Sequence, residues 1–225
     1  PSVNAINPKI IYGTVTGYGT KGPWKAKPGQ DLLVQSLSGL AYLSGAAADG
    51  PIPMGLAISD ILTGTHFTQG LLAALVKRGK TQKGALVEVS LLESMIDFQF
   101  EVLTTYFNDG GKSPQRAMKG NAHAYLSAPY GIYLTQDKYI AIAMIPMTKL
   151  AEFLNIELSD VYVSEESWFD QRDEIMHILR ATFVTKKSGE WLQIMESNNV
   201  WCTEVFNYEN LLSHEGYEVL KMDQE

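Results

Sequence analysis

Cysteine is nearly absent from this sequence: Cys202 is the single one among 225 residues, which excludes an internal disulfide. A chain without disulfides fits a reducing compartment, and we expect a cytoplasmic protein in which Cys202 is a small core residue. Long hydrophobic runs are also missing, because the longest, 139–147, is far too short to cross a bilayer. A membrane partner is therefore not expected.

Basic runs are equally scarce. None exceeds two residues, and 18 basic against 25 acidic residues give a net charge of −7. Proteins that bind nucleic acid usually carry a strongly positive patch, so a nucleic-acid partner is not expected. Apolar residues make up 45% of the chain and aromatic residues 10%, which is enough for a packed core.

Several motifs of known chemistry are missing. The four histidines are scattered, without the spacing of a metal site, so no metal is expected. Neither a Gly-x-Ser-x-Gly elbow nor a phosphate-binding P-loop occurs. Residues 17–22 match the dinucleotide pattern G-x-G-x-x-G, but Pro23 follows where that site needs a helix, so an open loop is predicted. On this loop Lys21, Lys25 and Lys27 either contact an anionic ligand or are simply solvated.

The first half of the chain has the pattern of an α/β layer. Runs rich in β-branched residues predict strands at 10–16 and 85–90. Helical spacing of apolar residues predicts helices at 30–43, 61–79 and 91–107. In the first of these helices Leu33, Leu37 and Leu40 share one face, and Asp31 near its start is a candidate cap.

The second half predicts a smaller α+β domain. The polar, Gly- and Pro-containing segment 108–119 marks a boundary, which gives domains 1–116 and 117–213. Strands at 130–134 and 139–144 form a hairpin. The helices expected after them cover 148–154, 171–183, 188–197 and 208–214, and three tryptophans should fill the gaps between helices: Trp168, Trp191 and Trp201.

The rest of the chain is organised around the stretch 51–90. Phe67, Leu71 and Leu75, with Leu72 and Val76 beside them, predict a one-sided apolar ridge on the helix 61–79. Small residues between them favour another backbone very close by. Asp60 stands just before this helix, where free N–H groups and the positive end of the helix dipole favour an acid. Two interpretations stay open at this point, an N-cap and a carboxylate nucleophile.

Five motifs occur in order with compatible spacing: PGQDLLVQSLSG at 28–39, AISDILTG at 57–64, GLLAAL at 70–75, KTQKG at 80–84 and APYG at 128–131. Together they resemble the class III CoA-transferases. This is the CaiB/BaiF family, which includes formyl-CoA transferase, carnitine CoA-transferase and the α-methylacyl-CoA racemases. The resemblance covers essentially all 225 residues.

The resemblance implies a fold and an assembly. The chain would hold the central part of a Rossmann-like large domain, followed by the smaller α+β domain and a linker, 214–225, that returns to the large domain. Family members form interlocked homodimers. The family's N-terminal part, which binds most of the CoA, would precede Pro1, and the missing initiator Met also suggests that the sequence is cut from a longer chain.

The resemblance also implies a reaction. Asp60 matches the catalytic aspartate, which attacks an acyl-CoA and forms an aspartyl-CoA thioester before an acceptor carboxylic acid takes over the CoA. Asp31 and Gln30 would orient or polarise the reacting groups, and Lys25 and Lys27 are candidates for CoA contacts. Coenzyme A enters as acyl-CoA substrate, and no metal is required.

Two alternatives remain beside this acyl-CoA:carboxylate CoA-transferase. An α-methylacyl-CoA racemase or epimerase needs an acid and a base around the acyl α-carbon. In that branch a histidine precedes the acid that matches Asp31, whereas this chain has Gln30, which cannot exchange a proton near neutral pH. That residue favours transfer. The other alternative is a non-catalytic fragment of such an enzyme.

Overall fold

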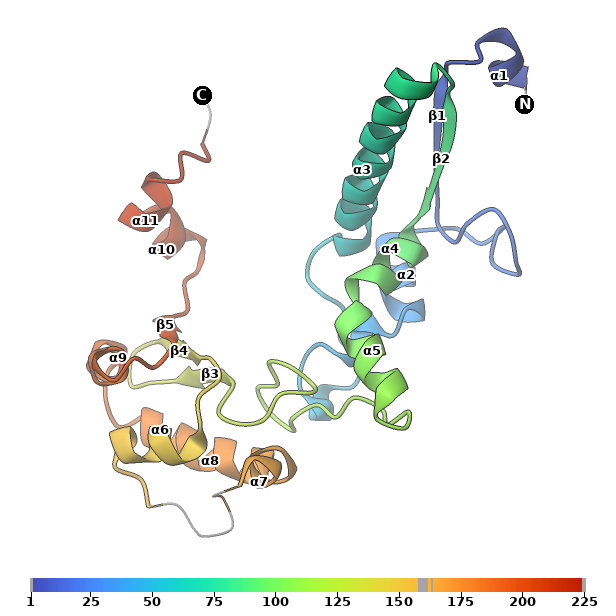
Figure 1. The fold of residues 1–225 in the computed structure, drawn as a ribbon. Coiled ribbons are helices and arrows are strands. Elements are labelled where there is room, and N and C mark those ends of the chain that lie inside the picture. Colours follow the sequence, from blue (N-terminus) through green and yellow to red (C-terminus); the bar gives the residue numbers. More distant parts are fainter. Residues whose placement is uncertain (1, 158–161, 163, 224–225) are drawn as a thin grey trace. The chain divides into compact units, whose positions relative to one another are not determined.

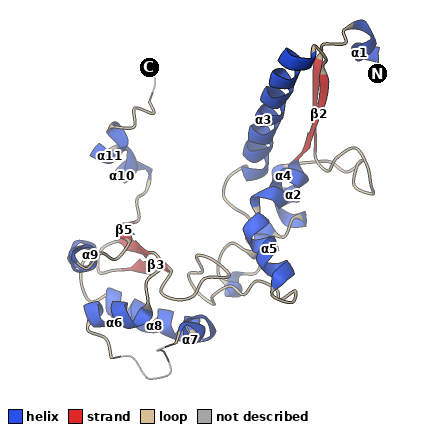
Figure 2. Cartoon of the chain, viewed as in Figure 1, coloured by secondary structure: helices blue, strands red, loops and turns tan. Residues whose placement is uncertain are grey.

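The computed structural model describes residues 2–157, 162 and 164–223, and the chain divides into two compact units (Figure 1). Unit 1 contains Pro1–Gly45 and Asp49–Gln115, and unit 2 contains Ala46–Ala48 and Arg116–Glu225. Each unit combines helices with a small sheet (Figure 2), so the mixed α/β fold class predicted from the sequence is confirmed.

Unit 1 is built on a pair of parallel strands. Its elements are α1 (Ser2–Ile6), β1 (Ile11–Thr16), α2 (Asp31–Leu37), the 3-10 turn η1 (Leu40–Tyr42), α3 (Ile58–Thr81), β2 (Ala85–Ser90), α4 (Leu91–Phe98) and α5 (Phe100–Asn108), and a second 3-10 turn, η2 (Ala47–Asp49), lies where the units meet in sequence. Parallel neighbours need a crossover connection, and α3 provides it. Gly13 of β1 makes room for Phe67 of α3, because a Cβ there would overlap the Phe67 ring. Both predicted strands are confirmed.

The predicted helix 30–43 is shorter in the structure. Helix α2 ends at Leu37, and Gly39 adopts a φ of 88°, which side-chain-bearing residues rarely take, before η1 begins. Val34 and Leu40 are buried, whereas Leu33 and Leu37 are exposed. The predicted leucine face is therefore wrong for two of its three members, because the break after α2 turns Leu40 onto the face of Val34.

Helix α3 packs through small and hydroxyl side chains. Its buried residues are Ser59, Thr63 and Ala74, while Leu72, Leu75 and Val76 are exposed. The predicted apolar ridge therefore holds for Phe67 and Leu71, which are half-buried beside Gly13 of β1, and is wrong for Leu72, Leu75 and Val76. Of the two glycines predicted to face a close backbone, a Cβ on Gly70 would meet the Val87 side chain, and one on Gly64 would meet no atom within 4 Å.

The predicted helix 91–107 is two helices. Gln99 separates α4 from α5, and its side-chain Nε2 donates to the Met95 carbonyl (3.0 Å) and to the Ser38 carbonyl beyond the end of α2 (3.3 Å). This buried amide links α4 to the end of α2. Met95, Leu91, Val34 and Leu40 form the small core of unit 1.

Unit 2 has an antiparallel sheet of order β3-β4-β5. Its elements are β3 (Gly131–Leu134), β4 (Tyr139–Ile142), α6 (Met147–Leu154), α7 (Glu165–Asp170), α8 (Arg172–Phe183), α9 (Ser188–Ser197), β5 (Cys202–Glu204), α10 (Tyr208–Leu212) and α11 (Glu215–Glu218). The hairpin and the helices near 148–154, 171–183 and 188–197 are confirmed. The helix expected at 208–214 is α10, which ends at Leu212. Strand β5 and helices α7 and α11 were not predicted.

The core of unit 2 lies between its helices and sheet. Trp191 and Trp168 are buried there as predicted, but Trp201 is 72% exposed, so its predicted packing role is wrong. Trp201 precedes the short strand β5, where its carbonyl accepts from the Ala143 N–H and its ring stays outside the core. Cys202 is half-buried against the core, and burial raises the pKa of its thiol.

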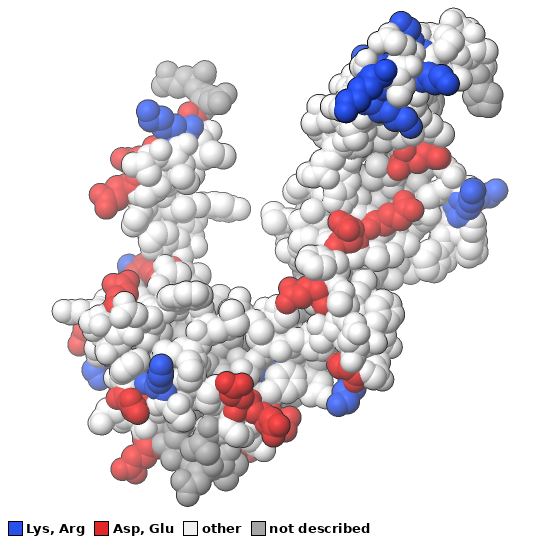
Figure 3. All heavy atoms as spheres, in the orientation of Figure 1, with Lys and Arg blue, Asp and Glu red and all other residues white. Residues whose placement is uncertain are grey.

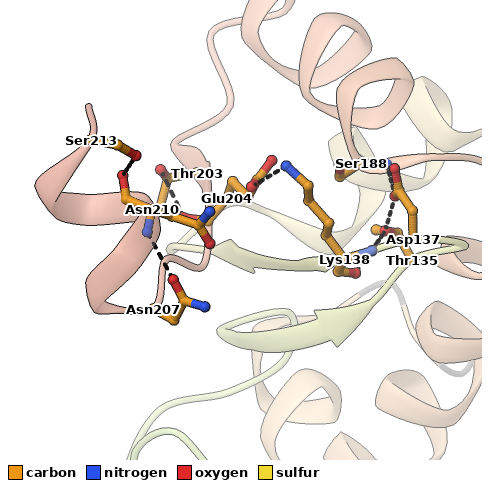
Figure 4. Close-up of polar contacts among 9 residues, drawn as sticks. All are labelled: Thr135, Asp137, Lys138, Ser188, Thr203, Glu204, Asn207, Asn210 and Ser213. Carbon is orange, nitrogen blue, oxygen red and sulfur yellow. Dashed lines mark hydrogen bonds and ion pairs between the residues drawn. The ribbon is translucent and has the colours of Figure 1, made fainter. Parts of the chain in front are cut away.

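Two polar ties hold the hairpin to its neighbours (Figure 4). In the turn between β3 and β4, Asp137 Oδ1 accepts from the Ser188 N–H at the start of α9 (2.8 Å) and from the Thr135 hydroxyl (3.0 Å). Lys138 Nζ donates to Glu204 Oε1 of β5 (2.6 Å). The backbone bond from Ser188, together with the Thr135 hydroxyl, lowers the pKa of Asp137.

Replacing Asp137 with Asn should therefore destabilise the protein at neutral pH but not in acid. A carboxylate with a lowered pKa stabilises the fold above its unfolded-state pKa, and this stabilisation is lost as the pH falls through the folded-state value. The measurement is the urea midpoint of both proteins between about pH 7 and pH 3, since the reference pKa is 3.8. A difference that stays constant over this range would contradict the prediction.

Candidate active site

Asp60 lies in the first turn of α3, as the third residue of this 24-residue helix, and its side chain is exposed. The N-cap is Ala57, which makes no side-chain capping bond. The N-cap interpretation of Asp60 is therefore wrong, because the helix begins three residues earlier than predicted. What remains is an accessible carboxylate near the positive end of the helix dipole.

The cap of α3 comes from another helix. Asp31, the first residue of α2, is buried, and its Oδ1 accepts from the Ser59 N–H (2.9 Å) and from the Ser59 hydroxyl (2.8 Å). The Ser59 N–H is one of the amides that a helix cannot satisfy internally. Asp31 thus holds the residue next to Asp60, and the sequence expectation that Asp31 caps its own helix is wrong.

Gln35 completes the support of this acid. Its Nε2 donates to Asp31 Oδ2 (2.7 Å) and to the Leu56 carbonyl (3.1 Å), while its Oε1 accepts from the Met54 N–H (2.8 Å). Gln35 is 1% exposed. Neither Gln35 nor Ser59 was predicted from the sequence, since no motif signals a pairing between residues about twenty to thirty positions apart.

Gln30 has a different place. It is exposed, and as N-cap of α2 its Oε1 accepts from the Leu32 N–H (3.1 Å). It follows that the observed role of Gln30 is to begin the helix that carries Asp31 and Gln35. A reaction role for Gln30 stays a prediction.

Lys25 and Lys27 lie on the loop that precedes α2, and both are exposed. No helix forms in this loop, so the open loop predicted from Pro23 is confirmed. The backbones of Gly17 and Gly29 lie against each other where this loop begins and ends, because a Cβ on Gly17 would lie 2.5 Å from the Gly29 Cα. In the described part of the chain, no hydrogen bond or ion pair joins either lysine to Asp31 or Asp60.

Basic side chains gather elsewhere on unit 1, over the end where α3 finishes (Figure 3). Arg78 and Lys80 lie in the last turn of this helix, where positive charge is favoured by the negative end of the helix dipole. The helix dipole thus gives these charges a structural role in α3.

Residues 2–157, 162 and 164–223 contain neither a cluster of metal ligands nor a membrane-spanning helix. No group of three or more His, Cys, Asp and Glu side chains there could hold a metal ion. The same residues include no helix that is both apolar enough and long enough to cross a bilayer.

Comparison with known proteins gives the family of this chain. The model of "CoA-transferase family III" matches residues 1–225. The chain belongs to this family, which confirms the resemblance found in the sequence.

Curated relatives in the family have named activities. The succinyl-CoA:glutarate CoA-transferase of Mus musculus is 30% identical over 204 residues, which is 88% of this chain and 46% of the relative. The human protein of the same name is 27% identical over 217 residues, 94% of this chain and 49% of the relative. The chain thus spans about half the length of the curated relatives it matches.

Solved structures agree with the fold. A CaiB/BaiF family protein from Brucella suis is 27% identical, with a TM-score of 0.82 over 98% of this chain and 59% of that one. The hypothetical protein Rv3272 from Mycobacterium tuberculosis is 21% identical, with a TM-score of 0.80. The match covers 99% of this chain and 60% of the Rv3272 chain. The second likeness supports the fold alone.

Proposed function

We propose that this chain carries the nucleophile of an acyl-CoA:carboxylate CoA-transferase and that Asp60 is this nucleophile. The observation that supports the proposal most directly is the place of its carboxylate. It is accessible, and it lies in a helix turn that the buried acid Asp31 fixes through Ser59. A reacting carboxylate needs both access and a fixed orientation.

The reaction would proceed by two exchanges at Asp60. A carboxylate oxygen attacks the thioester carbonyl of the donor acyl-CoA, the C–S bond breaks, and a mixed anhydride and CoA thiolate form. The thiolate attacks the Asp60 carbonyl carbon, the C–O bond breaks, and the donor acid leaves from an aspartyl-CoA thioester. An acceptor carboxylate then repeats both exchanges in reverse, so that a new acyl-CoA is released and Asp60 is regenerated.

Room for an acyl group beside Asp60 also supports the proposal. Gly64 is one helical turn after Asp60, and Gly55 is in the segment before α3. A Cβ on either glycine would meet no atom within 4 Å. A larger side chain at Gly64, which shares a helix face with Asp60, would narrow the approach of a thioester carbon to the carboxylate.

Water must be excluded during the reaction, because a carboxylate is a weak nucleophile when it is fully hydrated. Asp60 is exposed in this chain, which spans about half the length of its curated relatives. We therefore propose that other parts of the whole protein cover Asp60 and bind most of the CoA. By the same likeness the whole protein would be a cytoplasmic, interlocked homodimer, and light scattering would measure its mass.

Trapping of the intermediate tests the function. The relatives' names contain short dicarboxylic acids, so succinyl-CoA is the donor to use first. The protein as its gene encodes it is incubated with succinyl-CoA and hydroxylamine, and peptide mass spectrometry should find a hydroxamate on Asp60. An unmodified Asp60 in a protein that turns over the donor would contradict the proposal.

The two alternatives give different results in companion assays. A racemase would wash deuterium from solvent into the α-carbon of a branched acyl-CoA without any acceptor acid, whereas a transferase would not. A chain that is only a fragment should bind CoA more weakly than the whole protein. Equal affinities of the two would contradict the proposal that other parts bind most of the CoA.

A further inference from the structure

Gln35 is a large, fully buried polar side chain near the proposed nucleophile. It is 1% exposed, yet its amide makes three hydrogen bonds to two separate parts of unit 1. Two of them, to Met54 and Leu56, fix the segment that leads into α3. The third, to Asp31 Oδ2, holds the acid that caps α3.

These bonds require an amide. The Gln35 oxygen accepts from the Met54 N–H while its nitrogen donates to two acceptors, the Asp31 carboxylate and the Leu56 carbonyl. A carboxylate accepts only, and a hydrocarbon does neither. With Oδ2 held by Gln35, the other oxygen of Asp31 is directed to both donors of Ser59.

We infer that Gln35 is a positioning residue for the reaction at Asp60, acting through Asp31 and Ser59. This inference rests on the proposed function. The amide itself contacts no reacting atom. It fixes both the acid that caps the first turn of α3 and the chain that enters that turn, so it sets where the Asp60 carboxylate lies.

The replacement Gln35→Glu separates this role from simple packing, because it keeps the size and changes the hydrogen bonding. When ionised, the new carboxylate lies against that of Asp31 and can donate to neither former acceptor. When protonated, its O–H restores one of the two donor bonds. A buried carboxyl beside a like charge has a raised pKa, so acid should rescue this variant.

Other charged groups around this amide are few. The charged group on α2 is Asp31, and the one on α3 nearest to Ser59 in sequence is Asp60. Helix α4 also packs on α2 and carries Glu93, whose Oε2 accepts from the Ser90 hydroxyl, and Asp97, which pairs with His66. Neither of these two acids is bonded to Gln35 in the described part of the chain.

The test measures kcat and KM for succinyl-CoA in the natural protein, in Gln35→Glu and in Gln69→Glu. Gln69 is exposed on α3, so the third protein has the same charge change away from the site. We expect kcat of Gln35→Glu to fall about 10- to 100-fold at about pH 8 with KM nearly unchanged, as a displaced reacting group predicts. The deficit should shrink at about pH 6, while Gln69→Glu keeps the natural kcat.

Ser59→Ala provides a second measurement should Gln35→Glu not fold, as judged by circular dichroism. This variant removes one of the two bonds to Asp31 Oδ1 and keeps the backbone bond. Its kcat should fall about 3- to 10-fold with KM unchanged, in keeping with one lost hydrogen bond to a charged group. A natural kcat in a folded Gln35→Glu or Ser59→Ala protein would overturn the positioning role.

The hydroxylamine label distinguishes this failure from failure of the proposed function. No hydroxamate on Asp60 of the natural protein would remove the proposed function, whatever the variants do. If Asp60 of the natural protein is labelled and Gln35→Glu is labelled at the same rate at about pH 8, only the positioning role is overturned.

Discussion

Replacing Asp60 with alanine is expected to lower the kcat of CoA transfer by at least about 10⁴-fold, since loss of a covalent nucleophile costs on the order of 10⁴ to 10⁶ in other enzymes. The reaction needs an oxygen anion at this position, and alanine has none. Asp60→Asn should lose as much, because the amide keeps the shape without the charge. Asp60→Glu keeps the carboxylate but moves it, and a loss of about 100-fold is expected.

The fold should survive these changes. Asp60 is exposed, and the cap of α3 comes from Asp31 rather than from Asp60. Removing an acid from a helix first turn costs only about 0.3–1 kcal/mol. Urea unfolding should therefore separate lost chemistry from lost structure.

Asp97→Ala is the matched control for the Asp60 variants. Its carboxylate is 74% exposed in the same unit, where it pairs with His66. This variant should keep the natural kcat. Turnover of Asp60→Ala within tenfold of the natural protein would show that another group attacks the thioester, as on the order of 10⁴ is expected for a covalent nucleophile.

The sequence predicted the elements whose signals are local. The strand 85–90 has alternating β-branched residues after a polar turn, and the structure has β2 at Ala85–Ser90. The helix 188–197 is likewise confirmed by α9 at Ser188–Ser197. In both cases the pattern of neighbours within one turn or one strand decides the structure.

Other features depend on distant residues and could not be predicted. The break at Gln99 places an amide where it reaches the Ser38 carbonyl, 61 positions away. Periodicity alone predicted one continuous helix there. The packing prediction for Trp201 was wrong for a related reason. Strand β5 has only three residues and forms by pairing with β4, so no local pattern revealed which way the Trp201 side chain would face.

The candidate site shows the same division. Asp60 was found by its motif and by its place near a helix start, both of which are local. The partner of Asp31 is Ser59, 28 positions away, and it replaces the self-capping role that composition suggested. A capping acid supplied by another helix leaves no trace in one sequence, because any polar residue at the start of α2 would fit the local pattern.

Replacing Trp191 with alanine is expected to cost about 3–5 kcal/mol of unfolding free energy, the usual range for a fully buried large aromatic. Trp191 is 1% exposed, and its Nε1 donates to the Phe183 carbonyl (2.8 Å). Its ring packs edge-on against the Phe183 ring, with 5.4 Å between the ring centroids, and Phe183 in turn packs on Tyr133. Alanine would leave both a cavity and a buried carbonyl without its donor.

Trp201→Ala is the matched control, because it removes the same side chain from a position that is 72% exposed. Its cost should stay within about 0.5 kcal/mol, as for ordinary surface substitutions. Urea unfolding followed by far-UV circular dichroism measures both variants without relying on tryptophan fluorescence. Equal costs would mean that Trp201 is covered in the whole protein, or that Trp191 is not the centre of the unit 2 core. A Trp191→Phe variant decides between these, because it keeps most of the ring and should recover more than half of the loss only if Trp191 fills that core.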